Sequence, residues 1–427
     1  MKIQSYDKIG EQVHSERLPN GLSVFVIPKR GYNKSFAFFA ANYGGADRRF
    51  LHSGRWIDTP EGVAHFLEHK MFDTEDGNAL TDLSANGASP NAFTSSSMTA
   101  YHFESTEKFY ENLGILLKFV SVPYFTDESV GKEQGIIGQE IRMTEDEPDY
   151  AVYYGLMKAL YKSHPLRDSV AGTVESISEI TADTLYACHN VFYNPSNMVL
   201  CVAGDVDPAK VVKTALGILP REAGEVPRRD YGSVETLTPE KNRAETLMEV
   251  SQPIFLFGGK ASPQKNGEEY LRQELAGNLA LEYIIGKSSP LYARLYKERL
   301  INRDFSAAFE SSAGAAHFVC GGESRDPDAV FAAFSARAGE ITAGGIDEEL
   351  FRRIKKTAFG REMRAFNSFE NICYGYATGY FRGYDAFRSP GVLSELTPDD
   401  IMAFIRGNMS PEKLAISIIN PKKSTDV

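Results

Sequence analysis

Several features that would place this chain in a specialised class are scarce or missing. Four cysteines are scattered through 427 residues without a close-spaced pair, so the sequence predicts neither a disulfide scaffold nor a zinc site built from thiolates. No apolar run approaches the roughly 20 residues that a membrane-spanning helix needs. Residues 1–7 lack the apolar segment of a signal peptide. We therefore expect buried, reduced thiols and a cytoplasmic location.

Net positive charge is also missing, because the formal net charge at pH 7 is −11. Proteins that bind nucleic acid carry basic patches, so this balance argues against a nucleic-acid partner. The same charge permits a preference for basic peptides through long-range attraction. An apolar content of 42% over this length is enough for a large core and for two or more domains.

The segment HFLEH, residues 65–69, carries the clearest chemical signal in the chain. In a helix, His65 and His69 lie one turn apart on one face, where their rings can bind one Zn²⁺ at about 2.0–2.1 Å. Glu68 can lie beside that metal and accept a proton from a hydrolytic water. This order reverses His-Glu-x-x-His and is the inverzincin signature. The alternative is two ordinary histidines, but the apolar flanks predict a buried helix, whose polar groups need partners.

A catalytic zinc usually has three protein ligands and one open position, so a third ligand is needed. Glu133 and Glu140 are two helical turns apart and share a helix face. Two isoleucines, Ile136 and Ile137, lie between them. A carboxylate on an apolar face is unfavourable unless it is paired or bound to a cation. The spacing alone leaves open the alternative that both glutamates belong to a solvated acidic face.

Motifs along nearly the whole chain resemble those of the pitrilysin family of metallopeptidases, which includes insulin-degrading enzyme and mitochondrial processing peptidase. Together they are highly specific, and they comprise residues 18–22, 65–69, 86–88, 91–94, 133–140, 164–165 and 194–198. The chain is most similar to half-length bacterial members of the processing-peptidase type.

The resemblance implies a zinc peptidase with one Zn²⁺ per chain, bound by His65, His69 and Glu140. It implies that Glu68 is the general base. It also implies that Glu133 steadies the site without binding the metal.

The family's substrate lies along an edge strand that follows the motif helices, which would here be residues 91–103. The resemblance implies that Asn91, Ala92 and Phe93 line the substrate groove, where an extended peptide can add to the sheet by β-augmentation. The alternative is an ordinary edge strand that binds no ligand.

A repeat at a constant offset of 216 residues predicts an internal duplication. Residues 180–200 align with residues 396–416, and the identical pairs are Thr181/Thr397, Asp183/Asp399, Ala187/Ala403 and Pro195/Pro411. Each copy is typical of a capped helix, a turn at proline and an apolar strand.

The expected fold class is α+β, with two homologous domains that each contain a mostly antiparallel sheet packed with helices. We expect the domains at residues 1–225 and 235–427. At the same offset, the zinc motif aligns with the apolar residues Leu281, Ile284 and Ile285. The metal site is therefore expected in the N-terminal domain alone.

The chain departs from the family pattern in its C-terminal half. Members with complete sites carry an Arg and a Tyr, seven residues apart, that hold the substrate carbonyl. Here Tyr296 stands at the Arg position and Phe305 stands near the Tyr position. The spacing argues against a substitute role for Arg299 or Arg303. We therefore expect a heterodimer, in which a homologous partner supplies the Arg and the Tyr that stabilise the oxyanion.

The expected function is zinc-dependent endopeptidase action on short or unfolded peptides in an enclosed chamber, by the catalytic subunit of such a pair. One alternative is a non-catalytic structural or binding subunit, because the family includes such members. Another is a metal-dependent hydrolase that acts on a different substrate. Neither nucleic acid nor a membrane is expected as a partner.

Overall fold

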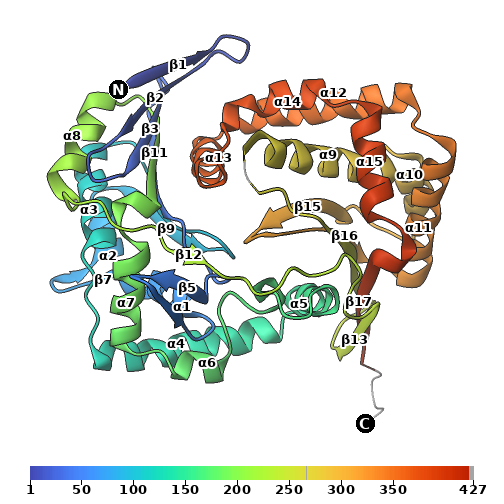
Figure 1. Cartoon of the computed structure of the whole chain (residues 1–427), viewed down its shortest axis with the longest axis horizontal. Coiled ribbons are helices and arrows are strands. Elements are labelled where there is room, and N and C mark those ends of the chain that lie inside the picture. Colours follow the sequence, from blue (N-terminus) through green and yellow to red (C-terminus); the bar gives the residue numbers. More distant parts are fainter. Residues whose placement is uncertain (266, 423–427) are drawn as a thin grey trace. The chain divides into compact units, whose positions relative to one another are not determined.

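The computed structural model describes residues 1–265 and 267–422, and it divides into two compact units (Figure 1). Unit 1 comprises Met1–Ile141, Ser169–Tyr231 and Met363–Phe387. Unit 2 comprises Arg142–Asp168, Gly232–Glu362 and Arg388–Val427. Residue 266 and residues 423–427, which belong to the predicted second domain, lie outside the described residues.

The sheet of unit 1 is antiparallel except at one pair, in which β3 and β11 run parallel. Its seven strands follow the order β1 (Lys2–Tyr6), β2 (Glu11–Arg17), β3 (Ser23–Pro28), β11 (Met198–Gly204), β4 (Ser35–Ala41), β10 (Thr99–Ser105) and β9 (Ala88–Thr94). Strand β9 therefore forms one edge and pairs only with β10.

Both faces of this sheet are covered by helices, because its strands are apolar on both sides. Successive residues point to opposite faces, so Phe39 and Tyr101 belong to one core while Phe38 and Ala100 belong to another. The first core includes residues of α3 (Phe109–Ser121) and α8 (Pro208–Ile218), and the second includes residues of α13 (Phe369–Arg382), which lies on the opposite side of the sheet (Figure 1).

The other elements of unit 1 surround this sheet. Its helices are α1 (Val63–Met71), α2 (Ala79–Ala85), α3 (Phe109–Ser121), α6 (Val174–Ser178), α7 (Ala182–Phe192), α8 (Pro208–Ile218), α13 (Phe369–Arg382) and most of α4 (Asp127–Glu145). Short strands complete it, namely β5 (Arg49–His52), β6 (Arg55–Asp58), β7 (Asp73–Thr74), β8 (Gly77–Asn78) and β12 (Arg228–Arg229).

Unit 2 repeats the core of this topology. Its sheet follows the order β13 (Arg243–Met248), β17 (Leu414–Pro421), β14 (Ile254–Ala261), β16 (Ala315–Glu323) and β15 (Ser306–Ser312). The β13–β17 pair is parallel and the other pairs are antiparallel, as in the β3–β11–β4–β10–β9 part of unit 1. Its helices are α5 (Pro148–Leu160), α9 (Gly267–Ile285), α10 (Pro290–Lys297), α11 (Pro327–Gly344), most of α12 (Glu348–Ala365), α14 (Ser389–Glu395) and α15 (Pro398–Asn408).

The element bounds follow the offset found in the sequence. Helix α7 becomes α15 and strand β11 becomes β17 when 216 is added to the residue numbers of their first residues. The expected α+β class, with two homologous and mostly antiparallel halves, is thereby confirmed.

Packing, rather than chain order, defines the two compact units. Helix α5 packs against β14 and β17 of unit 2, whereas α13 packs against β4 and β11 of unit 1. Each half of the chain thus gives one helix to the unit built mainly by the other half. The sequence predicts two domains that are consecutive halves of the chain. These domains, residues 1–225 and 235–427, stay a prediction.

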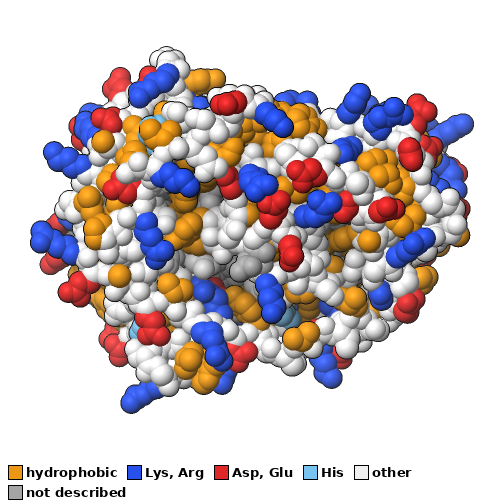
Figure 2. Space-filling model, turned by 45° about the horizontal axis from the view of Figure 1, so that its top comes forward, with side chains coloured by type: hydrophobic (Ala, Val, Ile, Leu, Met, Phe, Trp, Pro, Cys, Tyr) orange, Lys and Arg blue, Asp and Glu red, His pale blue; other side chains and the backbone are white. Residues whose placement is uncertain are grey.

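Three surface and composition features bear on the expectations above. Cys188, Cys201, Cys320 and Cys373 are free and buried. None of the helices among residues 1–265 and 267–422 has both the length and the apolar content to cross a bilayer. On the face drawn in Figure 2, the described basic and acidic side chains are interspersed.

Candidate metal site

Helix α1 presents the HFLEH segment from a buried position in unit 1. Phe66, Leu67 and Met71 are at most 1% exposed and belong to the core beneath the sheet. The helix begins after Gly62, whose φ of +91° is a left-handed conformation. A Cβ there would lie 2.5 Å from the carbonyl oxygen of Ala171, so only glycine fits. The start of the helix is therefore fixed by a close backbone approach.

Helix α4 brings the two glutamates to α1. Ile137 and Ile141 are buried and anchor the helix to the core. Ile136, by contrast, is 46% exposed, so the apolar character expected between the glutamates comes from Ile137 alone. Glu133 and Glu140 lie on the side of α4 that faces the histidines.

Three side chains converge as a metal site requires. Nε2 of His65 lies 3.7 Å from Oε1 of Glu140, and Nε2 of His69 lies 3.6 Å from Oε2 of the same carboxylate. One ligand atom from each residue lies within 4.8 Å of the other two. Tetrahedral ligands at 2.0–2.2 Å from Zn²⁺ are separated by about 3.4 Å. Two imidazoles and one carboxylate at these separations fit a zinc ion with only small adjustments.

Glu133 orients His69 toward this cluster. Oε1 of Glu133 lies 3.1 Å from Nδ1 of His69. A carboxylate accepts, so Nδ1 carries the proton and Nε2 presents its lone pair toward Glu140. Burial lowers the pKa of His69, but the bond to Glu133 and the nearby carboxylates Glu68 and Glu140 outweigh it, so the net pKa is raised. The carboxylates around His69 thus favour a positive charge at this position.

The His65 side chain is neutral at pH 7. Burial, with a smaller contribution from His69, lowers its pKa to about 4. Its Nδ1 has no hydrogen-bond partner in the described part of the chain. The two rings stand edge to face with centroids 4.6 Å apart, so both Nε2 atoms reach the same space.

Glu68 lies beside the three converging groups and is not one of them. It is 8% exposed. Thr94 donates a hydrogen bond of 2.6 Å from Oγ1 to Oε2 of Glu68. Burial raises the pKa of Glu68 and Glu140 adds to this, while Thr94 and His69 oppose it, so the net pKa is raised. A carboxyl with a raised pKa next to a metal site is suited to accept and release protons.

The three residues expected to line the substrate groove lie on the edge strand β9. Ala92 packs on the side of the sheet that carries α1, whereas Phe93 packs on the α13 side, with its ring 6.0 Å from those of Phe38 and Tyr374. Asn91 Oδ1 accepts a hydrogen bond of 2.9 Å from the N–H of Ala92. The structure thus places Asn91 and Phe93 on the opposite face from the histidines, and their role stays a prediction.

Thr94 is the contact that the sequence reasoning missed. It belongs to the matched segment 91–94, but no role was assigned to it. The available signal was the two-residue period of a strand: Thr94 shares a face with Ala92, which is the face that carries α1.

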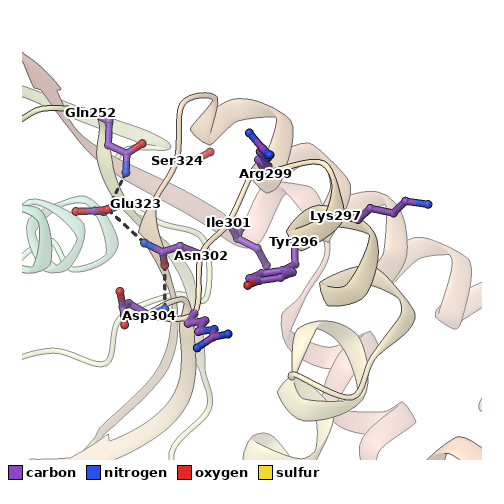
Figure 3. Close-up of a pocket in the computed structure, with 10 residues that line it drawn as sticks. Gln252, Tyr296, Lys297, Arg299, Ile301, Asn302, Asp304, Glu323 and Ser324 are labelled. Atoms are coloured by element: carbon purple, nitrogen blue, oxygen red, sulfur yellow. Dashed lines mark hydrogen bonds between the residues drawn. The ribbon is translucent and has the colours of Figure 1, made fainter.

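The stretch that departs from the family pattern lines part of a pocket in unit 2 of about 690 Å³ (Figure 3). Phe305 is 4% exposed and part of the apolar core, and its side chain has no hydrogen-bond donor. Tyr296 is 43% exposed and stacks on Tyr292. Arg299 and Arg303 line the pocket, and Lys297 points away from the Gln252–Glu323–Asn302 hydrogen-bond group (Figure 3).

Comparison with known proteins agrees with this geometry. Residues 50–174 match the family model Insulinase (Peptidase family M16), and residues 179–358 match the model Peptidase M16 inactive domain. The protein YmfH of Bacillus subtilis, named as an uncharacterised zinc protease, is 39% identical over 99% of this chain and 100% of its own length.

Solved structures share the fold. An M16-like peptidase from Alicyclobacillus acidocaldarius superposes with a TM-score of 0.93 at 33% identity, covering 96% of this chain and 99% of its own. Pitrilysin superposes with a TM-score of 0.78 at 16% identity, covering all of this chain and 46% of its own. The chain therefore belongs to peptidase family M16, the family of insulinase and pitrilysin, as a half-length member.

Proposed function

We propose that this chain is a zinc-dependent endopeptidase and the catalytic subunit of a heterodimer. The observation that carries the proposal is the convergence of His65 Nε2, His69 Nε2 and the Glu140 carboxylate, with Glu68 beside them and outside the set. A structural histidine pair would not need a carboxylate facing both rings. The zinc-protease names of relatives such as YmfH support the choice of metal.

His65, His69 and Glu140 hold one Zn²⁺ per chain in this proposal. When bound, Zn²⁺ acts as a Lewis acid that polarises a carbonyl and lowers the pKa of water. Glu133 holds His69 in the tautomer that presents Nε2, through the contact at Nδ1. Among the described residues one such cluster is found, and it lies in unit 1.

Glu68 performs the proton transfers. It accepts a proton from the attacking water and then delivers it to the leaving amine. Its Oε2 is occupied by Thr94, so Oε1 is the oxygen left to exchange protons. Burial of the carboxyl favours the protonated form after the first transfer.

An extended peptide adds to the sheet at β9 in this proposal, next to Asn91, Ala92 and Phe93. The N–H of Ala92 donates to Asn91 Oδ1. It lies on the open side of the strand, because antiparallel pairs alternate and the hairpin bond from the N–H of Ser95 to Met98 directs the odd-numbered residues of β9 toward β10. Pro90, two residues earlier, shares that side and has no N–H to leave unpaired. A rotation of the Asn91 side chain would free the N–H of Ala92 to donate to a carbonyl oxygen of the bound peptide.

The equivalent edge of unit 2 is already occupied. Asn278 of α9 accepts a hydrogen bond of 3.0 Å from the N–H of Phe309 and donates one of 3.4 Å to its carbonyl oxygen. Tyr270 donates to the carbonyl oxygen of Ser311. These side chains take the places that a peptide backbone would need along β15. This contrast supports β9 as the substrate strand.

A homologous partner supplies the missing Arg and Tyr, and peptides are cleaved in a chamber that the pair encloses. The support is the departure in unit 2, where Tyr296 stands at the Arg position and the buried Phe305 stands near the Tyr position. The substrates are short or unfolded peptides. The cytoplasmic location and the absence of nucleic-acid and membrane partners stay predictions.

The test is cleavage of an unstructured, fluorogenic peptide by the purified, zinc-loaded chain, alone and with a candidate partner. We expect zinc-dependent cleavage that the partner increases. Turnover by the chain alone that the partner cannot improve would remove the heterodimer. A fully zinc-loaded pair without any activity would instead favour a binding subunit, which is the second candidate because residues 179–358 match a model described as an inactive domain.

A further inference from the structure

We propose that Thr94 is the positioning residue of the general base, and that its hydroxyl holds Glu68 in the orientation that proton transfer requires. This inference rests on the proposed function. Oγ1 of Thr94 donates to Oε2 of Glu68 at 2.6 Å. No other hydrogen bond to the Glu68 carboxylate is made within the part of the chain that the structure describes, so one contact from β9 fixes this side chain of α1.

Thr94 is itself held in place. Its Oγ1 lies 3.4 Å from Oγ1 of Thr99, its cross-strand neighbour. Thr99 is fully buried and donates to the carbonyl oxygen of Tyr43 at 2.9 Å. The hydroxyl that orients Glu68 is therefore held by the sheet, and the sheet is more rigid than the end of a long side chain.

A hydroxyl suits both protonation states of the base. It donates to the carboxylate before proton transfer and can accept from, or donate to, the carboxylic acid after it. A carboxyl held at Oε2 in this way keeps Oε1 directed to the reacting water throughout the cycle. An apolar side chain of similar size offers no such bond.

Unit 2, the second copy of the fold, shows which residues stand at the positions of Thr94 and Glu68 when no general base is present. The duplication matches Met198 with Leu414, at the starts of β11 and β17. Following the strand pairings outward gives the equivalent pairs Ala41/Gly259, Thr99/Phe318 and Thr94/Phe309. The position of Glu68 is matched by Ile284 at the same offset as the repeat.

Both members of the polar pair are thus replaced together. Ile284 and Phe309 are 0% and 3% exposed and belong to the apolar core of unit 2. The fold accepts an apolar pair at these positions, so the hydroxyl of Thr94 is not required to build the sheet or the helix. The hydroxyl is present in the unit that carries the Glu68 carboxylate and absent at the equivalent position of the unit that lacks one.

The test compares Thr94→Val, which keeps the shape and loses the hydroxyl, with Thr94→Ser, which keeps the hydroxyl. Thr214→Val on α8 is the matched control, because its hydroxyl only bonds the carbonyl oxygen of Lys210. Zinc content, thermal stability, kcat and KM are measured for each, and zinc-loaded crystals of the wild type and Thr94→Val are solved.

We expect Thr94→Val to bind a full equivalent of zinc, to keep its KM and to lose kcat by about 10- to 100-fold. Thr94→Ser should restore most of kcat, and in the crystal of Thr94→Val the Glu68 carboxyl should leave its wild-type orientation. Wild-type kcat in a folded, zinc-loaded Thr94→Val protein, or an unmoved Glu68, would overturn the inference. An inactive wild type would count against the proposed function, and the two crystal structures would still decide the role of Thr94.

Discussion

Glu133 Oε1 lies 3.1 Å from His69 Nδ1, while the other ring nitrogen of His69 faces Glu140 at 3.6 Å. One helix therefore supplies both the group that orients this imidazole and the carboxylate opposite its lone pair. The first prediction follows from this relationship. Removing the orienting contact with Glu133→Ala should weaken zinc binding by about 10- to 100-fold.

A competition titration with a chromogenic chelator measures this change. Glu145→Ala, at the exposed end of the same helix, is the control and should bind zinc as the wild type does. Unchanged affinity in Glu133→Ala would show that His69 is oriented by packing alone.

The second prediction separates metal binding from proton transfer. Glu68→Gln keeps the shape and the acceptor for Thr94 but cannot take a proton. It should bind one zinc per chain and lose roughly 10²–10⁴-fold in kcat. Metal analysis and peptide cleavage on the same preparation test it, and a metal-free or fully active Glu68→Gln protein would contradict the assignment.

The third prediction concerns acid stability. His189 is buried, its Nε2 lies 3.1 Å from the carbonyl oxygen of Val120, and burial lowers its pKa to about 4 from the ordinary 6.5. Below pH 6.5 the unfolded chain binds a proton that the folded chain refuses, so stability falls as the pH decreases toward 4. Between pH 7 and pH 5 this one group should remove about 2 kcal/mol from the free energy of unfolding.

His189→Gln isolates that contribution, because an amide can keep the hydrogen bond to Val120 and does not titrate. Urea unfolding of the wild type and of His189→Gln at pH 7 and pH 5 gives, for each protein, the loss in the free energy of unfolding between these pH values. The variant should lose about 2 kcal/mol less than the wild type between these pH values. Equal losses would show that His189 is protonated as easily in the folded protein as in the unfolded chain.

The fourth prediction concerns the closed edge of unit 2. Asn278→Leu leaves the N–H of Phe309 without the acceptor it has now, and a buried donor without a partner costs about 1–3 kcal/mol. We expect that loss in the free energy of unfolding, with no change in zinc content. Asn408→Leu is the control, because Asn408 bonds only one carbonyl of its own helix, that of Phe404. An equal loss in both variants would mean that the Asn278 side chain does not seal the edge.

Local patterns in the sequence predicted much of this structure. The HFLEH spacing predicted a helix with two histidines on one face, and the seven-residue spacing of Glu133 and Glu140 predicted two carboxylates on one side of another helix. The offset of 216 residues predicted the repeated topology, because it preserves the helix caps, the proline turn and the apolar strand in both copies.

Contacts that join distant segments were not available from such patterns. The exchange of α5 and α13 between the units depends on which sheet face has room for a helix, and the apolar pattern of a helix does not show which sheet it will cover. The exposure of Ile136 beside the buried Ile137 depends on the rotation of α4 about its axis. The bond from Thr94 to Glu68 joins residues 26 apart and depends on how closely β9 approaches α1.

The central claim is that His65, His69 and Glu140 together bind one zinc ion. Zinc per chain should therefore be measured for the wild type, His65→Ala, Glu140→Ala and the control His14→Ala, after dialysis against a weak chelator. The account predicts one equivalent in the wild type and the control, and little in the other two. A full equivalent retained by Glu140→Ala and His65→Ala would contradict it.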